Sequence, residues 1–280
     1  MKKRAKVLIV CSLLFCFYSE GYSQDYYGGG GSWRKKPNND QQSKDKDNAA
    51  TDPSGYISIN LGFATPEGSF GEMLGSQYGN YADPGGLVFD FSLGVPINHS
   101  NFGVALMFGS YDNTYDVTSF ASNNQVYSLP TQTGQTDYSE SSIMGGLYVT
   151  YPIGRLSIDG RLMGGILLCT LPEQSVGYND QANNSWYLDT QPVNQNAFAV
   201  DAGIGARFLI AELGRRKLCL MANIDYLYSN VSYNTQQYVY ETYASGVNAG
   251  TTVQYVPSPT VSGHLPIQLM NITFGIGYQL

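Results

Sequence analysis

The chain has 280 residues, of which only 13% are charged, and its formal net charge of −7 makes it acidic. An acidic protein with few Lys and Arg residues offers no electrostatic footprint for nucleic acid, so we do not expect nucleic acid as a partner. Its 32 glycines and 23 tyrosines favour β-structure with polar connections over helix. Beyond the N-terminus no run of about twenty apolar residues occurs, so the sequence predicts no membrane-spanning helix.

The N-terminus has the pattern of a secretory signal peptide. Basic residues within the first six positions precede an apolar run from Val7 to Tyr18. Gly21 and Ser23 then supply small residues before Gln24, where cleavage is expected. Phe15 before Cys16 does not fit a lipoprotein signal. We therefore expect residues 1–23 to be removed and the mature chain to be exported.

Residues 24–53 are hydrophilic, low in complexity and poor in aliphatic side chains. Such a segment cannot bury enough apolar surface to offset its ordering entropy. The sequence predicts a disordered tail there, ahead of a folded domain over residues 54–280.

Eight later segments alternate apolar residues with small or polar ones, which is the pattern of half-buried β-strands. The first, "GYISINLGFATP", places Ile57, Ile59, Leu61 and Phe63 on one face. In chain order the eight segments are 55–66, 86–96, 102–111, 142–152, 155–168, 197–209, 218–229 and 271–280. Each is about ten residues long, which suffices to cross a bilayer at a tilt.

The face opposite the apolar one decides between a soluble sandwich and a membrane barrel. It carries mostly Gly, Ser, Thr, Asn and Ala, whereas a soluble sandwich would carry many charged residues there. Small polar residues suit the crowded lumen of a small barrel. The predicted fold class is therefore all-β, an eight-stranded antiparallel up-and-down transmembrane β-barrel.

The lengths of the connections predict how the barrel is oriented. Short connections follow the second, fourth and sixth segments, and long ones occupy 66–85, 112–140, 170–196 and 229–266. Outer-membrane barrels keep short turns in the periplasm and long loops outside the cell. None of the four long segments contains Lys or Arg. We expect the tail of residues 24–53 to lie in the periplasm.

The opening "GYISINLGFATPEGSFG", the eight alternating segments and the closing "ITFGIGYQL" resemble the small outer-membrane β-barrel family of Bacteroidota-type bacteria, within the OmpA-like and OmpX-like class. The resemblance implies a location in the cell outer membrane of a Gram-negative bacterium. It leaves the activity open, because members of this class serve as anchors, adhesins and accessory parts of secretion machines. The final Leu280 departs from the aromatic residue that usually ends such barrels.

Several charged residues fall on the face that should line the lumen. They are Asp90, Asp159, Arg161, Asp201, Arg207 and Asp225. An ion or proton path is one interpretation. We favour an internal salt-bridge plug, because an eight-stranded lumen is only wide enough for its own side chains and buried charges persist when paired.

The long loops are the main candidate for a functional surface. They hold eleven acidic residues: Glu67, Glu72, Asp83, Asp112, Asp116, Asp137, Glu140, Glu173, Asp180, Asp189 and Glu241. Aromatic candidates for recognition are Tyr115, Tyr127, Trp186, Tyr187, Tyr238, Tyr240 and Tyr243. Tyr and Trp beside Asn and Ser are typical of recognition loops. We expect a structural or interaction role for the protein. The alternative is an accessory role in a secretion or surface-assembly machine, and a narrow channel or a lipid-modifying enzyme is less favoured than either.

We expect no enzyme activity, cofactor or metal. Ser262, His264 and Glu241 could be imagined as a catalytic triad, but their spacing does not require one. No Asp-x-Asp-x-Asp-Gly calcium loop occurs. The expected partners are outer-membrane lipid and a protein at the loops or the tail, with the chain itself monomeric.

Only Cys169 and Cys219 follow the signal peptide. Cys169 ends the fifth segment on the outer side, and Cys219 begins the seventh on the periplasmic side, about 25 Å away along the barrel. A disulfide needs Cα atoms within about 7 Å. The sequence therefore predicts two free thiols.

Overall fold

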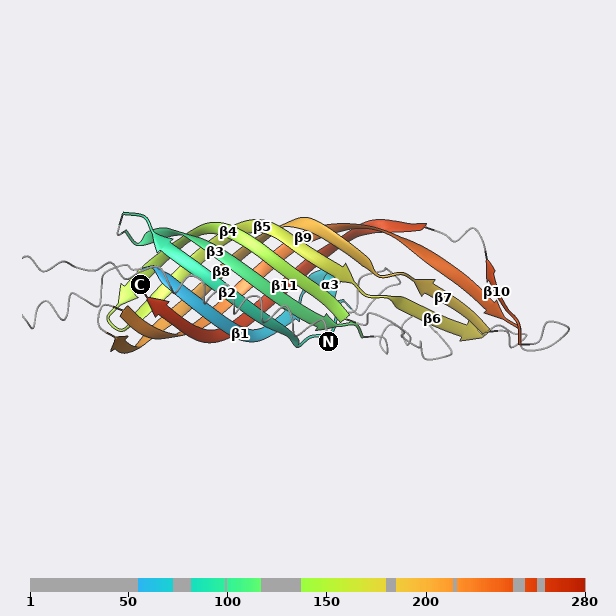
Figure 1. Ribbon diagram of the computed structural model, residues 1–280, viewed down its shortest axis with the longest axis horizontal. Helices are drawn as coiled ribbons and strands as arrows, with labels where there is room; N and C mark the ends of the chain where they lie inside the picture. The colour runs from blue at the N-terminus through green and yellow to red at the C-terminus, as the bar shows by residue number, and fades with distance from the viewer. Residues whose placement is uncertain are drawn as a thin grey trace, which may run out of the picture. The chain divides into compact units, whose positions relative to one another are not determined.

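A computed structural model describes residues 55–72, 82–98, 100–116, 137–179, 185–213, 216–243, 250–255 and 260–279 (Figure 1). These ranges fall in one compact unit that covers residues 45–280. The predicted signal peptide and periplasmic tail lie outside the described residues, as does Tyr127. No helix among the described residues is long and apolar enough to span a membrane.

Eight antiparallel strands form a closed ring. They are β1 (Tyr56–Pro66), β2 (Gly86–Pro96), β3 (Phe102–Thr114), β4 (Asp137–Ile153), β5 (Leu156–Leu171), β8 (Val193–Leu213), β9 (Arg216–Thr242) and β11 (Thr260–Gln279). Each pairs with the next along the chain, and β11 pairs with both β9 and β1. All eight predicted segments are confirmed as strands, and the predicted fold class is confirmed.

The ring closes between the first and the last strand. The paired residues run from Tyr56 opposite Gln279 to Pro66 opposite Leu269 without a register shift. Every residue of β1 therefore faces a residue of β11 on one side, and most face one of β2 on the other. Because no strand of the ring is left as an edge, its backbone groups can be satisfied without water.

The outer wall of the ring is apolar. Leu61, Phe198 and Phe274 are 63%, 70% and 60% exposed, and large aliphatic or aromatic side chains occupy the same face of every ring strand. Alternate residues such as Asn60, Ser92 and Thr273 point inward and are buried. This belt has the polarity of a surface that lipid covers, as the alternation predicted.

The connections differ in length at the two ends of the ring. Turns at one end join β2 to β3, β4 to β5 and β8 to β9 across at most five residues. The other end carries the long connections, and we call it the outer end on the rule that short turns face the periplasm.

The boundaries predicted for the long loops were wrong. Strand β9 continues to Thr242 and β11 begins at Thr260, so most of 229–266 is strand. Segment 170–196 contains a hairpin of β6 (Gln174–Asn179) and β7 (Ser185–Thr190). Above the belt the outward face of a strand meets water instead of lipid and carries polar residues, so the apolar alternation that marks a strand in lipid is lost and the strand resembles a loop in sequence.

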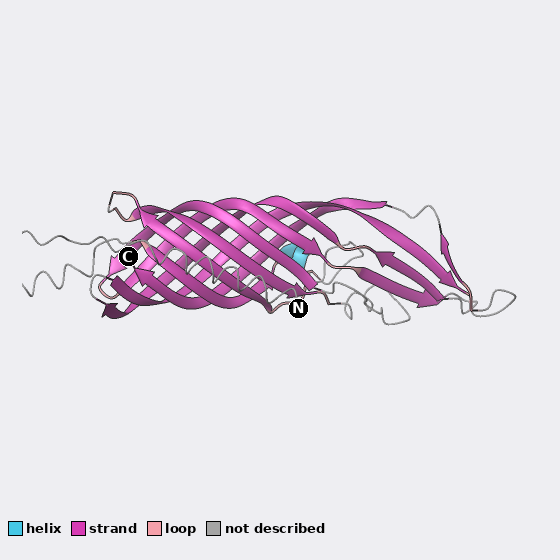
Figure 2. Cartoon of the chain, viewed as in Figure 1, coloured by secondary structure: helices cyan, strands magenta, loops and turns pink. Residues whose placement is uncertain are grey.

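The hairpin joins the long strand beyond the ring. Strand β7 pairs with the far part of β9, and β10 (Thr252–Tyr255) pairs with the end of β9 on its other side. Strands β6, β7 and β10, together with residues 237–242 of β9, thus form what we call the outer sheet, which projects past the outer end of the ring (Figure 2).

Both cysteines of the barrel are free and buried, which confirms the prediction of two free thiols. Cys169 lies opposite Glu140 and Gln195, whereas Cys219 lies opposite Leu209 and Gly277.

We predict that the folded barrel resists thiol alkylation and that two thiols per chain react after denaturation without reductant, since burial limits access. Mass spectrometry of non-reduced, alkylated protein measures both values. A crosslink between Cys169 and Cys219 would contradict the strand register.

Candidate functional site

The periplasmic half of the lumen contains a buried ion pair between β5 and β9. Arg161 donates from Nε to Asp225 Oδ1 over 2.6 Å, and its second terminal nitrogen bonds the other carboxylate oxygen. The two side chains are only 7% and 4% exposed. Gly203 on β8 faces Asp225, and a side chain at that position would collide with the carboxylate. The glycine therefore makes room for the pair.

A second pair joins β5 to β8. Arg207 donates to Asp159 from Nε over 2.6 Å and from a terminal nitrogen over 2.7 Å. The same terminal nitrogen donates to Thr150 Oγ1 over 2.8 Å, and Thr150 donates in turn to Asp159. The guanidinium also lies 4.7 Å from the ring centre of Tyr56, which packs edge-on against Tyr148. This network connects side chains of β1, β4, β5 and β8 inside the lumen.

The remaining predicted lumenal acids are Asp90 and Asp201. Asn60 donates to Asp90 over 2.6 Å. Asp201 is fully buried within electrostatic range of Arg161, but neither carboxylate oxygen has a hydrogen-bond partner among the described residues. All six predicted residues therefore lie inside the lumen, but only four of them form ion pairs, Arg161 with Asp225 and Arg207 with Asp159.

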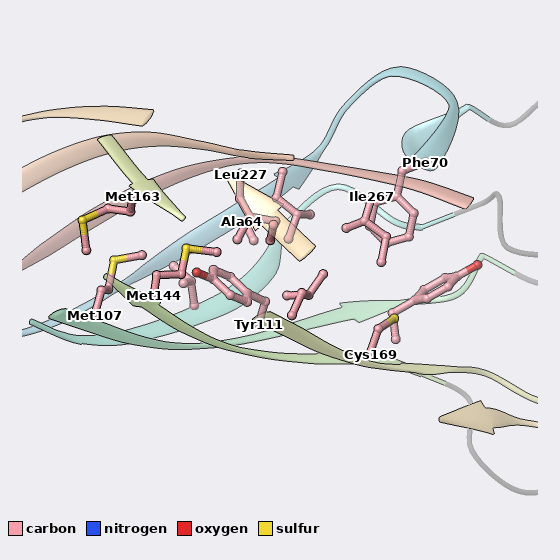
Figure 3. Packing of buried hydrophobic residues seen from close by; sticks show 14 of the residues in the cluster. Ala64, Phe70, Met107, Tyr111, Met144, Met163, Cys169, Leu227 and Ile267 are labelled. Atoms are coloured by element: carbon pink, nitrogen blue, oxygen red, sulfur yellow. The ribbon is translucent and has the colours of Figure 1, made fainter. Parts of the chain in front are cut away.

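The outer half of the lumen is mainly apolar, although Glu140 and Asn113 are also buried there. Phe70, Tyr111, Leu227 and Ile267 are at most 2% exposed and belong to one cluster of buried side chains. Figure 3 shows these residues, with Ala64 and Cys169, between the strands that enclose the lumen. The lumen thus contains two different layers of buried side chains, a charged one in the periplasmic half and a mainly apolar one in the outer half.

A short helix supplies part of the apolar layer. Helix α3 (Gly68–Gly71) follows β1, and its Phe70 packs edge-on against Tyr138 of β4 with ring centres 5.0 Å apart. Gly68 has a φ of +54°, and a side chain there would collide with Gln268 of β11. Glycine at this position allows the chain to turn inward after β1.

Several lumenal residues, among them Glu140 and Tyr138, were missed because they fell within predicted loops. Glu140, which we had placed in a loop, lies on β4 and is fully buried opposite Cys169, with both carboxylate oxygens lacking a hydrogen-bond partner among the described residues. Tyr138 points inward on the same strand. The alternation of "DYSESSIMGG" carries this signal, but the outward residues beside Glu140 are Ser139 and Ser141 rather than apolar side chains.

The recognition candidates divide between lumen and surface. Tyr115 is 3% exposed and packs near Tyr138, so it is not available at the surface. Tyr238, Tyr240 and Tyr243 are partly exposed, and the first two have ring centres 6.5 Å apart. Trp186 and Tyr187 lie on β7, opposite Glu241 and Tyr240 of β9.

Acidic groups accompany these tyrosines. Asp189 of β7 lies opposite Tyr238, and its side chain shares a hydrogen bond with Glu173. Burial raises the pKa of the Asp189 carboxyl, and the hydrogen bond with Glu173 opposes that rise. Glu241, in contrast, is only 4% exposed. On the outer sheet, Asp189 therefore lies beside Tyr238, whereas Glu241 is buried.

The imagined triad is not assembled. His264 Nδ1 lies 3.0 Å from Ser232 Oγ on the neighbouring strand, whereas Glu241 is nine residues further along β9, about 30 Å at the usual rise of a strand. The part of the chain that the structure describes contains no group of three His, Cys, Asp or Glu side chains placed to hold a metal ion.

A closed ring of strands that is apolar outside and polar inside belongs in lipid, because it leaves no edge strand and turns its apolar face outward. The chain is an outer-membrane β-barrel protein.

Neither a protein-family model nor a curated protein matches the sequence. Among solved structures, Neisserial surface protein A is 10% identical, with a TM-score of 0.43 over 81% of this chain and 97% of that one. A major outer membrane protein from Thermus thermophilus is 11% identical (TM-score 0.38; 81% and 98% covered). OprG from Pseudomonas aeruginosa is 14% identical (TM-score 0.37; 83% and 99% covered). These likenesses are too distant to indicate an activity.

We predict that Arg161→Met destabilises the barrel by about 3–5 kcal/mol, because it leaves the Asp225 carboxylate buried without its partner. The double variant Arg161→Met with Asp225→Asn should recover part of this loss. Urea unfolding in lipid vesicles measures the free energies.

Arg155→Gln is the control, because Arg155 is exposed in the turn between β4 and β5. Its effect should stay within about 0.5 kcal/mol. An equally small effect of Arg161→Met would show that the lumenal pair does not stabilise the barrel.

Proposed function

We propose that this protein is a closed barrel whose function is recognition at the cell surface through the outer sheet. The observation that carries the proposal is the unequal length of the strands. Strand β9 has 27 residues and β1 has 11, so a long part of β9 rises beyond the ring and is widened there by β6, β7 and β10. This added structure is not needed to span the membrane.

The filled lumen argues against transport. Two ion pairs occupy its periplasmic half, and Phe70 with the apolar cluster occupies its outer half. A solute would have to displace both layers. The role of the barrel is then to anchor the outer sheet in the membrane.

The charge of the outer end indicates the chemistry of a partner. The outer sheet and the other long connections carry acidic residues and no Lys or Arg. Tyr238 and Tyr240 offer large contact areas at small cost in side-chain entropy, next to Asp189. We infer a partner with a basic, polar surface, drawn in by charge and held by the aromatic side chains.

We predict that the purified protein in planar bilayers shows no steady, large current of the kind that an open porin gives in the same bilayers. The reason is that the two layers of side chains leave no continuous path. Single-channel recording is the measurement. Reproducible large currents from the wild-type chain would show that the lumen is open.

We also predict that a photoreactive phenylalanine derivative in place of Tyr238 or Tyr240 captures one and the same external partner on intact cells. The yield should fall with rising salt, because exposed charges are screened. The matched control carries the derivative in place of Tyr151, which is 66% exposed near the periplasmic end. Immunoblotting and mass spectrometry identify the products.

Two results would count against recognition at the outer sheet. One is the absence of any product from either position. The other is capture of the same membrane complex from Tyr151 as from Tyr238, which would favour an accessory role in a secretion or surface-assembly machine.

A further inference from the structure

The apolar belt contains a groove in its periplasmic half, formed by β8, β9 and β11. Its volume is about 270 Å³. The residues that line it are Ala206, Phe208, Leu220, Met221, Ala222, Phe274 and Gly275. We call it the belt groove.

Residue size explains the hollow. Ala206 lies opposite Ala222, and Ala222 lies opposite Phe274, so two small side chains meet where neighbouring rows have large ones. One row nearer the periplasm, Phe208 and Leu220 are opposite each other and 47% and 52% exposed. The small side chains of Ala206 and Ala222 therefore form the floor of the groove, and the larger side chains around them form its walls. All of the side chains that line the groove are apolar.

A cation lies below the groove at the rim of the barrel. Arg216 begins β9, is exposed, and donates to the Tyr278 hydroxyl over 3.2 Å. Its guanidinium lies 5.6 Å from the centre of the same ring. The aromatic ring thus holds a positive charge at the outer wall, facing the membrane interface rather than the lumen.

The distance between charge and groove matches a lipid tail. Ala222 follows Arg216 by six residues on the same face of β9, which is about 20 Å along the strand and about 15 Å along the membrane normal at the usual tilt. Half the hydrocarbon core of a bilayer is also about 15 Å thick. A headgroup at Arg216 therefore places the end of its acyl chain at the belt groove.

We propose that the belt groove and Arg216 together form a binding site for one phospholipid of the periplasmic leaflet. The phosphate accepts hydrogen bonds from the Arg216 guanidinium, and one acyl chain runs past Leu220 and Ile276 into the groove. The site is independent of the proposed recognition function, because it lies at the opposite end of the barrel from the outer sheet.

The two parts of the site contribute differently. Surrounding lipid is as apolar as the groove, so the acyl chain is held by close van der Waals contact and not by the hydrophobic effect. The Arg216 contact favours lipids with a net negative headgroup and accounts for about fivefold in affinity. A phosphatidylglycerol should therefore bind better than a phosphatidylcholine with the same chains.

The test uses phosphatidylglycerol with a photoreactive diazirine near the end of one acyl chain, as a trace component of phosphatidylcholine nanodiscs that contain the full mature chain. After illumination, peptide mapping by mass spectrometry should find the label concentrated on the parts of β8, β9 and β11 that line the groove. Ala222→Leu, which fills the groove, should abolish most of that labelling. Arg216→Gln should weaken competition by unlabelled phosphatidylglycerol about fivefold.

Matched controls keep the test specific. Ala202→Leu adds the same bulk at an exposed position of β8 outside the groove, and Arg155→Gln removes a different charge from the periplasmic rim. Both should leave the labelling unchanged. If Ala222→Leu does not fold, as judged by the heat-dependent gel shift of barrels, Ala206→Leu serves in its place.

Three results would overturn the proposal: label spread evenly over all ring strands, equal labelling of the groove-filling variant and its control, or unchanged competition by unlabelled phosphatidylglycerol in Arg216→Gln. None of these depends on the outer sheet, and the groove variants should leave photocapture at Tyr238 unaltered. Failure of the lipid site and failure of the recognition function are therefore distinguishable.

Discussion

Closure of the ring between β1 and β11 is the constraint on which the rest of the structure depends. In hydrocarbon no water is present to satisfy an unpaired backbone group, so an open sheet could not remain in lipid. The continuous pairing from Tyr56–Gln279 to Pro66–Leu269 removes both edges at once. Once the ring is closed, each residue has only two directions for its side chain, outward to lipid or inward to a narrow lumen. The alternation of apolar and polar residues along each strand follows from these two directions.

The narrow lumen imposes a second requirement, because whatever points inward must pack or pair. In the periplasmic half, the ion pairs Arg161–Asp225 and Arg207–Asp159 meet this requirement. Arg207 and Asp159 lie on neighbouring strands, whereas β8 separates the strands of Arg161 and Asp225. The outer half meets the same requirement with apolar side chains, completed by Phe70. Glycine on facing strands provides the space for the larger groups. A barrel of this width thus becomes a solid anchor.

Strand length separates the anchoring part of the molecule from the part that projects from it. The ring needs only about ten residues per strand to cross the bilayer. Strand β9 is 27 residues long, and its excess provides the edge onto which β7 and β10 add. The outer sheet therefore continues the hydrogen-bond ladder of the barrel into water. One continuous strand, β9, therefore contributes both to the membrane anchor and to the surface that we propose binds a partner.

The sequence by itself determined the eight ring strands, their order and the face that each turns to lipid, because the two-residue period of an apolar outer face is a local property. It also indicated the lumenal charges and the two free thiols, since both follow from counting along strands. Only the tertiary structure decided which charges pair, because Arg161 and Asp225 are 64 residues apart in the chain. The same holds for the places of Glu140, Tyr115 and the outer sheet, because the outward residues there meet water and are polar, which removes the apolar signal. The belt groove, too, exists only once Ala206 and Ala222 are brought together by the register of β8 and β9.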